Sequence, residues 1–421
     1  LRDFQKLGKD ETFKSVVPYY IIQIYYMQGR YDELLELARP YLKGQRNKRT
    51  NEILRIVADV NYKRGNFQEA INLLEEYRKV SRGKFSREET YILAYSYYKT
   101  GEYARAIPEF QQVAGGEDSL SQNAWYHLGD SYLKTSQKQF ASNAFLSAWK
   151  VPVKTELAED ALFNYAKLSI ELSYNPYNEA IRALQQYLAE YPASPRRDEA
   201  YTYLANLYLV TRNYREALST LENIKKRTPA QDEIYQKITY YRGLELFADN
   251  QFFDAIGMFK KSAGLKSDGL IAAGALFWAG ESYYRLGQYD QAATYYRDFQ
   301  NAPGAKNHTA YTSANYSLGY AMLKQKNYSQ AAEAFNLFIE SRPLDKKMLN
   351  DARLRKADAF FMQKRYQEAI AGYDQVIGSR AADTDYALYQ KSLAVGVTGN
   401  ISQKIASLRK LVADFPGSTY N

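Results

Sequence analysis

A short turn signature recurs along this 421-residue chain at a nearly constant spacing. A glycine or polar residue is followed by an aromatic residue and then, three residues on, by alanine, as in "GNFQEA", "GEYARA", "RNYREA" and "GQYDQA". With the variants "SQKQFA" and "GNISQK" there are eleven units, 35–39 residues apart. A fixed period of this size is typical of a repeat array, in which each unit packs only on its neighbours. The chain is therefore predicted to be such an array and not two or three globular domains.

Two columns of residues run in phase with this turn. The first column holds a small residue in ten of eleven units and consists of Ile22, Ala58, Ala94, Gly129, Ala166, Ala205, Gly243, Gly280, Gly319, Ala357 and Ser392. The second column holds alanine in nine of eleven units and consists of Leu34, Ala70, Ala106, Ala141, Ala180, Ala217, Ala255, Ala292, Ala331, Ala369 and Lys404. Small residues let two antiparallel helices approach closely. Each unit is therefore predicted to be a pair of helices of about 12 to 16 residues, each with an apolar face.

One unit carries the fullest form of the pattern, with Trp125, Leu128, Gly129, Tyr132, Ala141, Phe145 and Pro152. This spacing is that of the tetratricopeptide repeat, W-x2-L-G-x2-Y followed by A-x3-F and P. The chain resembles a tetratricopeptide-repeat array over essentially its whole length. The resemblance implies an all-α fold, an α-α superhelix or solenoid of about eleven helix-turn-helix repeats.

The two ends and one turn depart from the pattern. Residues 1–14 resemble the second helix and loop of a preceding repeat, and 15–421 are predicted to form a continuous array of eleven repeats. We expect this array to be cut from a longer one at both ends, because neither end carries a polar capping face. The segment "SIELSYNPYNEA" has about two extra residues in its turn by this alignment.

The residues that carry enzyme chemistry are scarce in this chain. It has no cysteine and two histidines, His127 and His308, far apart in the sequence, so neither a thiolate nucleophile nor a transition-metal site is expected. His127 is followed by Asp130 and Ser131, but nothing suggests the exposed nucleophile and oxyanion hole of a hydrolase, and it is interpreted as a surface histidine. No glycine-rich segment has the spacing of a phosphate-binding loop. The sequence predicts neither an enzyme nor a cofactor.

Charge and apolar content exclude two further classes of partner. The net charge of +9 is a dilute excess, with 56 basic and 47 acidic residues, so nucleic acid is not expected as a ligand. The aromatic residues of the turns are interpreted as core, not as platforms for stacking bases; they include Tyr31, Phe67, Tyr103, Tyr214, Tyr289, Tyr328 and Tyr366. No run approaches the roughly 18 to 20 apolar residues that span a bilayer, so this sequence is not expected to insert into a membrane, although a lipid anchor outside it is compatible with the pattern.

The resemblance implies a concave groove lined by the first helices, where tetratricopeptide proteins hold a protein or peptide. Carried onto this sequence, the predicted binding residues are Tyr19, Tyr26, Arg55, Tyr62, Lys63, Tyr91, Tyr95, Tyr98, Lys99, Tyr126, Asp130, Lys134, Tyr284, Arg285, Tyr320 and Lys324. Equivalent positions are held by Asp59, Tyr240, Phe277, Glu281, Tyr316 and Asp358. Tyrosine at this density gives rigid, amphipathic contact area, which is typical of protein-binding surfaces.

Five of these residues form a basic ladder at one repeat position, namely Lys63, Lys99, Lys134, Arg285 and Lys324. The ladder fits a ligand with acidic groups. A second explanation fits the ladder equally well, because a cation in the last turn of a helix complements the helix dipole. The asparagine-rich clamp of chaperone-binding tetratricopeptide domains is not matched, because Asp59, Tyr95 and Asp130 stand at those positions.

Two loops bear on the cellular compartment in which the protein is expected to work. "YPAS" and "FPGS" resemble the (F/Y)-P-x-S loop of bacterial periplasmic tetratricopeptide proteins, the Tol-Pal accessory protein and the lipoprotein of the barrel-assembly machinery. The long, tyrosine-rich, cysteine-free array is also similar to envelope proteins of Bacteroidetes-type bacteria. We therefore expect a scaffold in envelope assembly at the periplasmic face of the outer membrane. The alternative is a cytoplasmic regulatory or substrate-binding array belonging to a larger enzyme or signalling protein.

Overall fold

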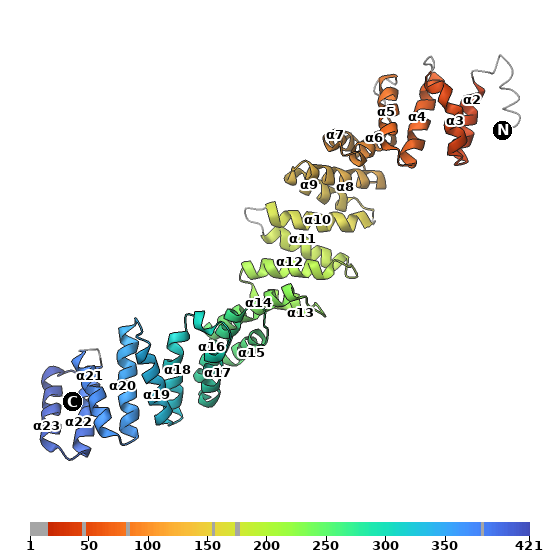
Figure 1. Ribbon diagram of the computed structural model, residues 1–421. Helices are drawn as coiled ribbons and strands as arrows, with labels where there is room; N and C mark the ends of the chain where they lie inside the picture. The colour runs from red at the N-terminus through yellow and green to blue at the C-terminus, as the bar shows by residue number, and fades with distance from the viewer. Residues whose placement is uncertain (1–15, 44–47, 81–84, 154–155, 173–176, 380–382) are drawn as a thin grey trace. The chain divides into compact units, whose positions relative to one another are not determined.

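The computed structural model describes residues 16–43, 48–80, 85–153, 156–172, 177–379 and 383–421 (Figure 1). Within these residues the regular structure is entirely helical, with 22 α-helices and one 3-10 helix. This confirms the predicted all-α fold of eleven helix pairs. The predicted tail at 1–14 lies outside the described residues, and so does the centre of the long turn, at 173–176.

The chain divides into two compact units, Leu1–Leu204 and Ala205–Asn421. Unit 1 contains α2 (Val17–Met27), α3 (Tyr31–Leu42), α4 (Lys48–Lys63), α5 (Phe67–Val80), α6 (Arg87–Lys99), α7 (Tyr103–Val113), α8 (Ser119–Lys134), α9 (Lys138–Lys150), α10 (Glu156–Leu172) and α11 (Tyr177–Glu190). The boundary lies within α12 (Arg197–Val210). Unit 2 contains α13 (Tyr214–Glu222), α14 (Pro229–Ala248), α15 (Phe252–Ala263), α16 (Gly269–Arg285), α17 (Tyr289–Asn301), η1 (Ala305–Asn307), α18 (Tyr311–Lys324), α19 (Tyr328–Glu340), α20 (Lys346–Met362), α21 (Tyr366–Gly378), α22 (Thr384–Val397) and α23 (Ile401–Asp414).

The first helix of each pair has an even label and the second an odd label. Consecutive helices pack side by side from α2 to α11 in unit 1 and from α13 to α23 in unit 2 (Figure 1). First helices also contact the first helices of neighbouring pairs, as α4 contacts α6 and α16 contacts α18, whereas among the described residues second helices meet one another at most weakly. Each unit therefore presents one closely packed face made of first helices.

The two small-residue columns are where the helices of a pair meet. Every alanine of the second column is fully buried. A Cβ added at Gly319 would lie 2.8 Å from the ring of Phe335 on the second helix, and one at Gly280 would lie 2.8 Å from the ring of Tyr296. The first pair reverses this arrangement, since Ile22 is fully buried where others have a small residue, and Ala38 stands where others have a ring or a leucine. The large and small residues of a pair are thus complementary.

The turn signature is the C-terminus of the first helix. Gly65 has φ +79°, and its N–H donates to Tyr62 O at 3.0 Å while Asn66 N–H donates to Asn61 O at 2.8 Å. This double closure of a helix end requires a left-handed residue, for which glycine is best suited. The same place is taken by a residue other than glycine in five turns, at Ser136, Arg212, Asn250, Lys326 and Lys364.

Helix lengths vary more than predicted. They range from 9 residues in α13 to 20 in α14. Thr228 caps α14 by accepting from Gln231 N–H, the Gln231 side chain accepts from Thr228 N–H, and Pro229 occupies the first turn. This capping box starts α14 early in the sequence, so less of the chain is left for α13.

The aromatic residues at the start of the second helices are half-buried, so interpreting them as core was wrong. In six turns this ring packs against a ring in the last turn of the first helix. The pairs are Tyr26–Tyr31, Tyr62–Phe67, Tyr98–Tyr103, Phe247–Phe252, Tyr284–Tyr289 and Phe361–Tyr366, with centroids 5.3–6.4 Å apart. These pairs close each turn at the surface.

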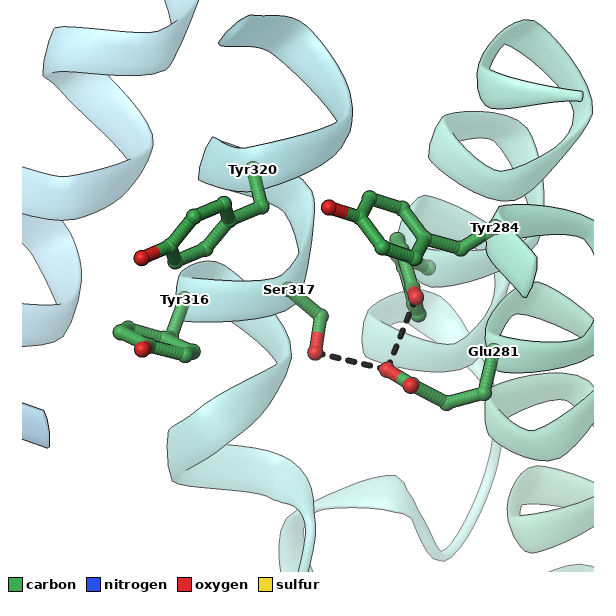
Figure 2. Close-up of a pocket in the computed structure, with 6 residues that line it drawn as sticks. Glu281, Tyr284, Tyr316, Ser317 and Tyr320 are labelled. Carbon is green, nitrogen blue, oxygen red and sulfur yellow. Dashed lines mark hydrogen bonds between the residues drawn. The ribbon is translucent and has the colours of Figure 1, made fainter. Parts of the chain in front are cut away.

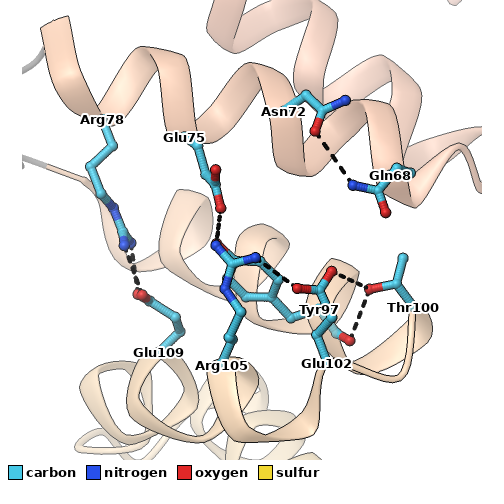
Figure 3. A network of polar contacts seen from close by, with 9 residues as sticks. All are labelled: Gln68, Asn72, Glu75, Arg78, Tyr97, Thr100, Glu102, Arg105 and Glu109. Carbon is cyan, nitrogen blue, oxygen red and sulfur yellow. Dashed lines mark hydrogen bonds and ion pairs between the residues drawn. The ribbon is translucent and has the colours of Figure 1, made fainter.

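Polar side chains tie neighbouring second helices together in unit 1 (Figure 3). Arg78 on α5 makes two hydrogen bonds of 2.7 Å to the carboxylate of Glu109 on α7, which is only 8% exposed. Arg105 on α7 pairs with Glu75 on α5, which also accepts a hydrogen bond of 2.6 Å from Tyr97. A two-fold Arg–carboxylate pair fixes orientation as well as distance. The spacing of α5 and α7 is therefore set by side chains.

Candidate partner-binding surfaces

All sixteen predicted binding residues lie on first helices, namely α2, α4, α6, α8, α16 and α18. Their role in binding stays a prediction. Tyr19 accepts a hydrogen bond of 2.7 Å from Gln23, and Arg55 pairs with Glu52 at 3.0 Å and with Glu89 at 3.5 Å. One equivalent position was assigned wrongly, because Phe277 is 8% exposed and packs on Phe299 inside the core.

Several groove tyrosines bond to an aspartate of the next repeat. Tyr98 on α6 donates to Asp130 on α8 at 2.6 Å, and Tyr26 on α2 donates to Asp59 on α4. Tyr126 on α8 donates to Asp160 on α10. Burial and the aspartate raise the pKa of Tyr98 and of Tyr126. These hydroxyls therefore hold neighbouring first helices together. A ligand can then contact the aromatic rings of these tyrosines, since their hydroxyls are already bonded.

An aromatic cluster on α4, α6 and α8 surrounds His127; its tyrosines are Tyr62, Tyr91, Tyr95, Tyr98 and Tyr126. The His127 ring lies 4.9 Å from Tyr95, 5.0 Å from Tyr98 and 5.3 Å from Tyr126, between centroids. Burial lowers its pKa to about 4, and its Nδ1 atom has no hydrogen-bond partner among the described residues. Interpreting His127 as a surface histidine was therefore wrong. Ser131 donates to the main-chain oxygen of His127 at 2.7 Å, so these two side chains form no catalytic pair.

The basic ladder differs from one repeat to the next. Lys63 pairs with Asp59 at 2.8 Å and donates to the Tyr26 hydroxyl at 2.5 Å. Lys99 lies 5.9 Å from the centroid of the Tyr95 ring. Among the described residues, no carboxylate lies within 4.0 Å of the four exposed cations Lys99, Lys134, Arg285 and Lys324. Each stands in the last turn of its helix, so binding of acidic groups and complementation of the helix dipole both remain open.

Unit 2 contains a partly open cavity of about 200 Å³ between α16, α17 and α18, lined by Glu281, Tyr284, Tyr296, Tyr316, Ser317 and Tyr320 (Figure 2). Glu281 Oε1 accepts hydrogen bonds of 2.8 Å from both Tyr296 and Ser317. Tyr316 and Tyr320 donate to Asp351 on α20 at 2.8 and 2.5 Å. Burial and that aspartate raise the pKa of Tyr320 to about 12. The cavity thus combines aromatic walls with one carboxylate.

The groove alignment found part of this cavity and missed the rest. Glu281, Tyr284, Tyr316 and Tyr320 stand at groove positions. Tyr296 belongs to the second helix, where it matches the large residue of A-x3-F, and reaches Glu281 because Gly280 leaves room for its ring. The place of Tyr296 in the cavity wall had no signal in the sequence.

Two kinds of site were sought in the described part of the chain. No helix there is long and apolar enough to cross a membrane. Nor does any cluster of three or more histidine, aspartate or glutamate side chains there have the geometry to hold a metal ion.

Comparison with known proteins bears on the repeat family. The tetratricopeptide repeat family model matches residues 91–150, which run from within α6 to the end of α9. The match supports the tetratricopeptide repeat for this part of the chain. A second family model, described as "T7SS, ESX-1 secretion system protein EccA1, N-terminal domain", matches residues 169–371 of the chain. No curated protein matches the chain.

Several solved structures resemble this chain at low identity. Naa15/Naa10 bound to HypK-THB is 12% identical over 88% of this chain and 64% of that chain, with a TM-score of 0.39. YrrB, described as a tetratricopeptide protein with an unusual peptide-binding site, is 16% identical over 57% and 96%, with a TM-score of 0.35. The P58(IPK) tetratricopeptide domain is 15% identical over 83% and 99%, with a TM-score of 0.26. None of these likenesses identifies a partner for this chain.

Proposed function

We propose that this protein is a non-catalytic scaffold that holds a segment of a partner protein against its first-helix face. The observation that carries the proposal is the pairing of a rigid aromatic surface with exposed cations in unit 1. Lys99 and Lys134 have no carboxylate partner among the described residues and lie on the same helices as Tyr95, Tyr98 and Tyr126.

A ligand that binds this surface orders few side chains, so the entropic cost of binding is small. The hydroxyls of Tyr98 and Tyr126 are fixed by aspartates of the next repeat, so these rings lose little conformational entropy when a ligand covers them. Fixed rings supply contact area, and the exposed cations select acidic side chains of the ligand and set its register. We therefore propose an acidic partner segment for the unit 1 surface.

Site-specific photo-crosslinking tests this surface. A benzophenone amino acid at Lys99 or Lys134 is expected to crosslink one partner in cells, whereas the same group at Gln112 or Asn143, exposed on second helices, is expected not to. The double substitution Lys99→Glu with Lys134→Glu should lower the affinity for the captured partner at least about 10-fold, since it replaces attraction by repulsion. Lys150→Glu, on the second helix α9, is the control for a charge reversal away from this surface. Equal crosslinking from both faces would contradict the proposal.

For the setting, we propose envelope assembly or secretion in a bacterium, at the periplasmic face of the outer membrane. The (F/Y)-P-x-S loops support the envelope, and the match to a secretion-system family over 169–371 supports secretion. Fractionation of cells making the full-length protein tests this. Recovery with outer-membrane material is expected, and recovery in the cytoplasmic fraction alone would overturn it.

The second candidate is a regulatory or substrate-binding array within a larger protein. The family description favours it in one respect, because it names an N-terminal domain, which is part of a longer chain. Crosslinks from Lys99 that fall only within the same polypeptide would support this candidate over a scaffold for a separate partner.

A further inference from the structure

Only one oxygen of the Glu281 carboxylate accepts hydrogen bonds from the residues that the structure describes. Oε1 accepts from both Tyr296 and Ser317, at 2.8 Å each, and among the described residues no group donates to Oε2. Glu281 lines the cavity of about 200 Å³, beside the rings of Tyr284 and Tyr320 (Figure 2). A carboxylate oxygen in such a place is an acceptor for a cation or another donor.

The walls of this cavity are fixed aromatic rings. Tyr316 and Tyr320 both donate to Asp351, outside the cavity, and their ring centroids are 5.0 Å apart. Tyr284 packs on Tyr289 at 5.4 Å. A cation near the face of a tyrosine ring is attracted by the negative face of its π-system. Held rings beside a carboxylate thus form a site for a positive charge.

The charges around the cavity do not cancel that of Glu281. Asp351 is already paired with Arg355 at 3.2 Å, and Arg355 also pairs with Asp358 at 2.8 Å. Arg285 and Lys324 come shortly after the lining residues Tyr284 and Tyr320 in the sequence, but neither of the two cations lines the cavity. Glu281 is therefore the carboxylate that a ligand in this cavity meets.

We propose that this cavity receives a lysine side chain of the partner, with its ammonium group on Glu281 Oε2 and its methylenes between the tyrosine rings. The volume is below the roughly 300 Å³ at which pockets for drug-sized molecules begin, so a single side chain is the fitting occupant. Arginine binds carboxylates best through both oxygens, and here one oxygen is taken, whereas an ammonium needs one acceptor only. The inference rests on the proposed scaffold function and names the partner chemistry for unit 2.

Nuclear magnetic resonance on the full chain with ¹³C-labelled tyrosine tests the site. The probe is Nα-acetyl-lysine N-methylamide, which is expected to shift the signals of Tyr284, Tyr316 and Tyr320 saturably at about millimolar concentration. Loss of single signals in Tyr→Phe variants assigns them. The norleucine analogue, which lacks the charge, is expected to leave them unshifted, and the arginine analogue to bind at least about 10-fold more weakly.

Two variants separate the charge from the rings. Glu281→Gln keeps an oxygen for Tyr296 and Ser317 and is expected to lower the affinity for the lysine analogue at least about 10-fold, whereas Glu333→Gln, exposed on α19, is expected not to change it. Tyr284→Leu removes one aromatic wall and should also weaken binding, even if Glu281→Gln fails to fold. Unchanged affinity in both variants, the absence of a saturable shift, or equal binding of the norleucine or arginine analogue would overturn the proposal. Crosslinking from Lys99 and Lys134 does not depend on this cavity, so the two proposals fail separately.

Discussion

The hydroxyl of Tyr98 on α6 donates a hydrogen bond of 2.6 Å to the carboxylate of Asp130 on α8 and so joins the first helices of two neighbouring repeats. Tyr26 and Asp59 repeat this bond two pairs earlier, at the same two repeat positions. In a repeat array, stability depends on such interfaces between neighbours as much as on each repeat itself. A groove tyrosine in this protein is therefore a structural residue as well as a candidate contact.

Tyr98→Phe should lower the free energy of unfolding of unit 1 by about 1 to 2 kcal/mol, because it removes a hydrogen bond to a charged group and leaves the ring. Urea denaturation followed by circular dichroism measures this. Tyr103→Phe is the control, since the ring of Tyr103 packs against Tyr98 and its hydroxyl makes no hydrogen bond to any residue that the structure describes. Equal effects of the two substitutions would show that the Tyr98–Asp130 bond contributes nothing.

The lowered pKa of His127 predicts that the folded protein loses stability in mild acid. Its pKa is lowered to about 4 in the folded protein, against about 6.5 in an unfolded chain, so between these values the unfolded state binds more protons. The contribution of His127 is therefore constant above pH 6.5 and falls by up to about 3 kcal/mol as the pH drops towards 4. Asp130 and Lys99, which act on His127 in opposite directions, remain in the variant described next.

The substitution His127→Phe isolates this effect. Phenylalanine fits an aromatic surrounding and does not titrate, so the variant should lose less stability than the wild type between pH 6.5 and 4. Urea midpoints at pH 7, 5.5 and 4 measure the difference. Parallel pH profiles for the two proteins would mean that His127 is not held neutral by its tyrosines.

Gly319→Ala should destabilise unit 2 by about 1 to 3 kcal/mol through overpacking, because the new Cβ would lie 2.8 Å from the ring of Phe335. Adding Phe335→Leu should recover part of this loss, since the pair of Ala58 and Leu74 shows alanine and leucine at the same two positions, both buried. Thermal unfolding of the single and double variants tests the coupling. Additive losses would argue against complementary sizes at this contact.

Lys326→Gly should stabilise unit 2 by about 0.5 to 1 kcal/mol. Lys326 has φ +63°, and this left-handed conformation strains the backbone of any residue with a Cβ. The strain energy that glycine removes is larger than the entropy that glycine adds to the unfolded chain. Gly287→Ala, at the corresponding turn with φ +74°, should destabilise by about 1 kcal/mol. Urea midpoints of both variants check the signs, and a shift in the same direction for both would contradict the turn geometry.

The groove shows where reading a sequence by repeat position succeeds. Because each side chain projects from a helix at an angle fixed by its place in the repeat, the alignment placed Tyr62, Tyr95 and Tyr98 on first helices, and all three are there. It could not show that Tyr98 bonds to Asp130, or that Lys63 pairs with a carboxylate while Lys99 has no such partner in the described part of the chain. Those outcomes depend on which residues of two repeats, some 30 to 40 positions apart, come within hydrogen-bond distance.

The sequence by itself determined the all-α fold, the eleven helix pairs and the turn positions, because these follow from local spacing and from small residues at fixed places, such as Gly319 and Ala331. The tertiary structure alone decided the buried setting of His127 and the cavity around Glu281. Both are assembled from side chains of several helices, and the number and position of their neighbours set how far each is removed from water. Burial is a property of that surrounding and has no period in the sequence.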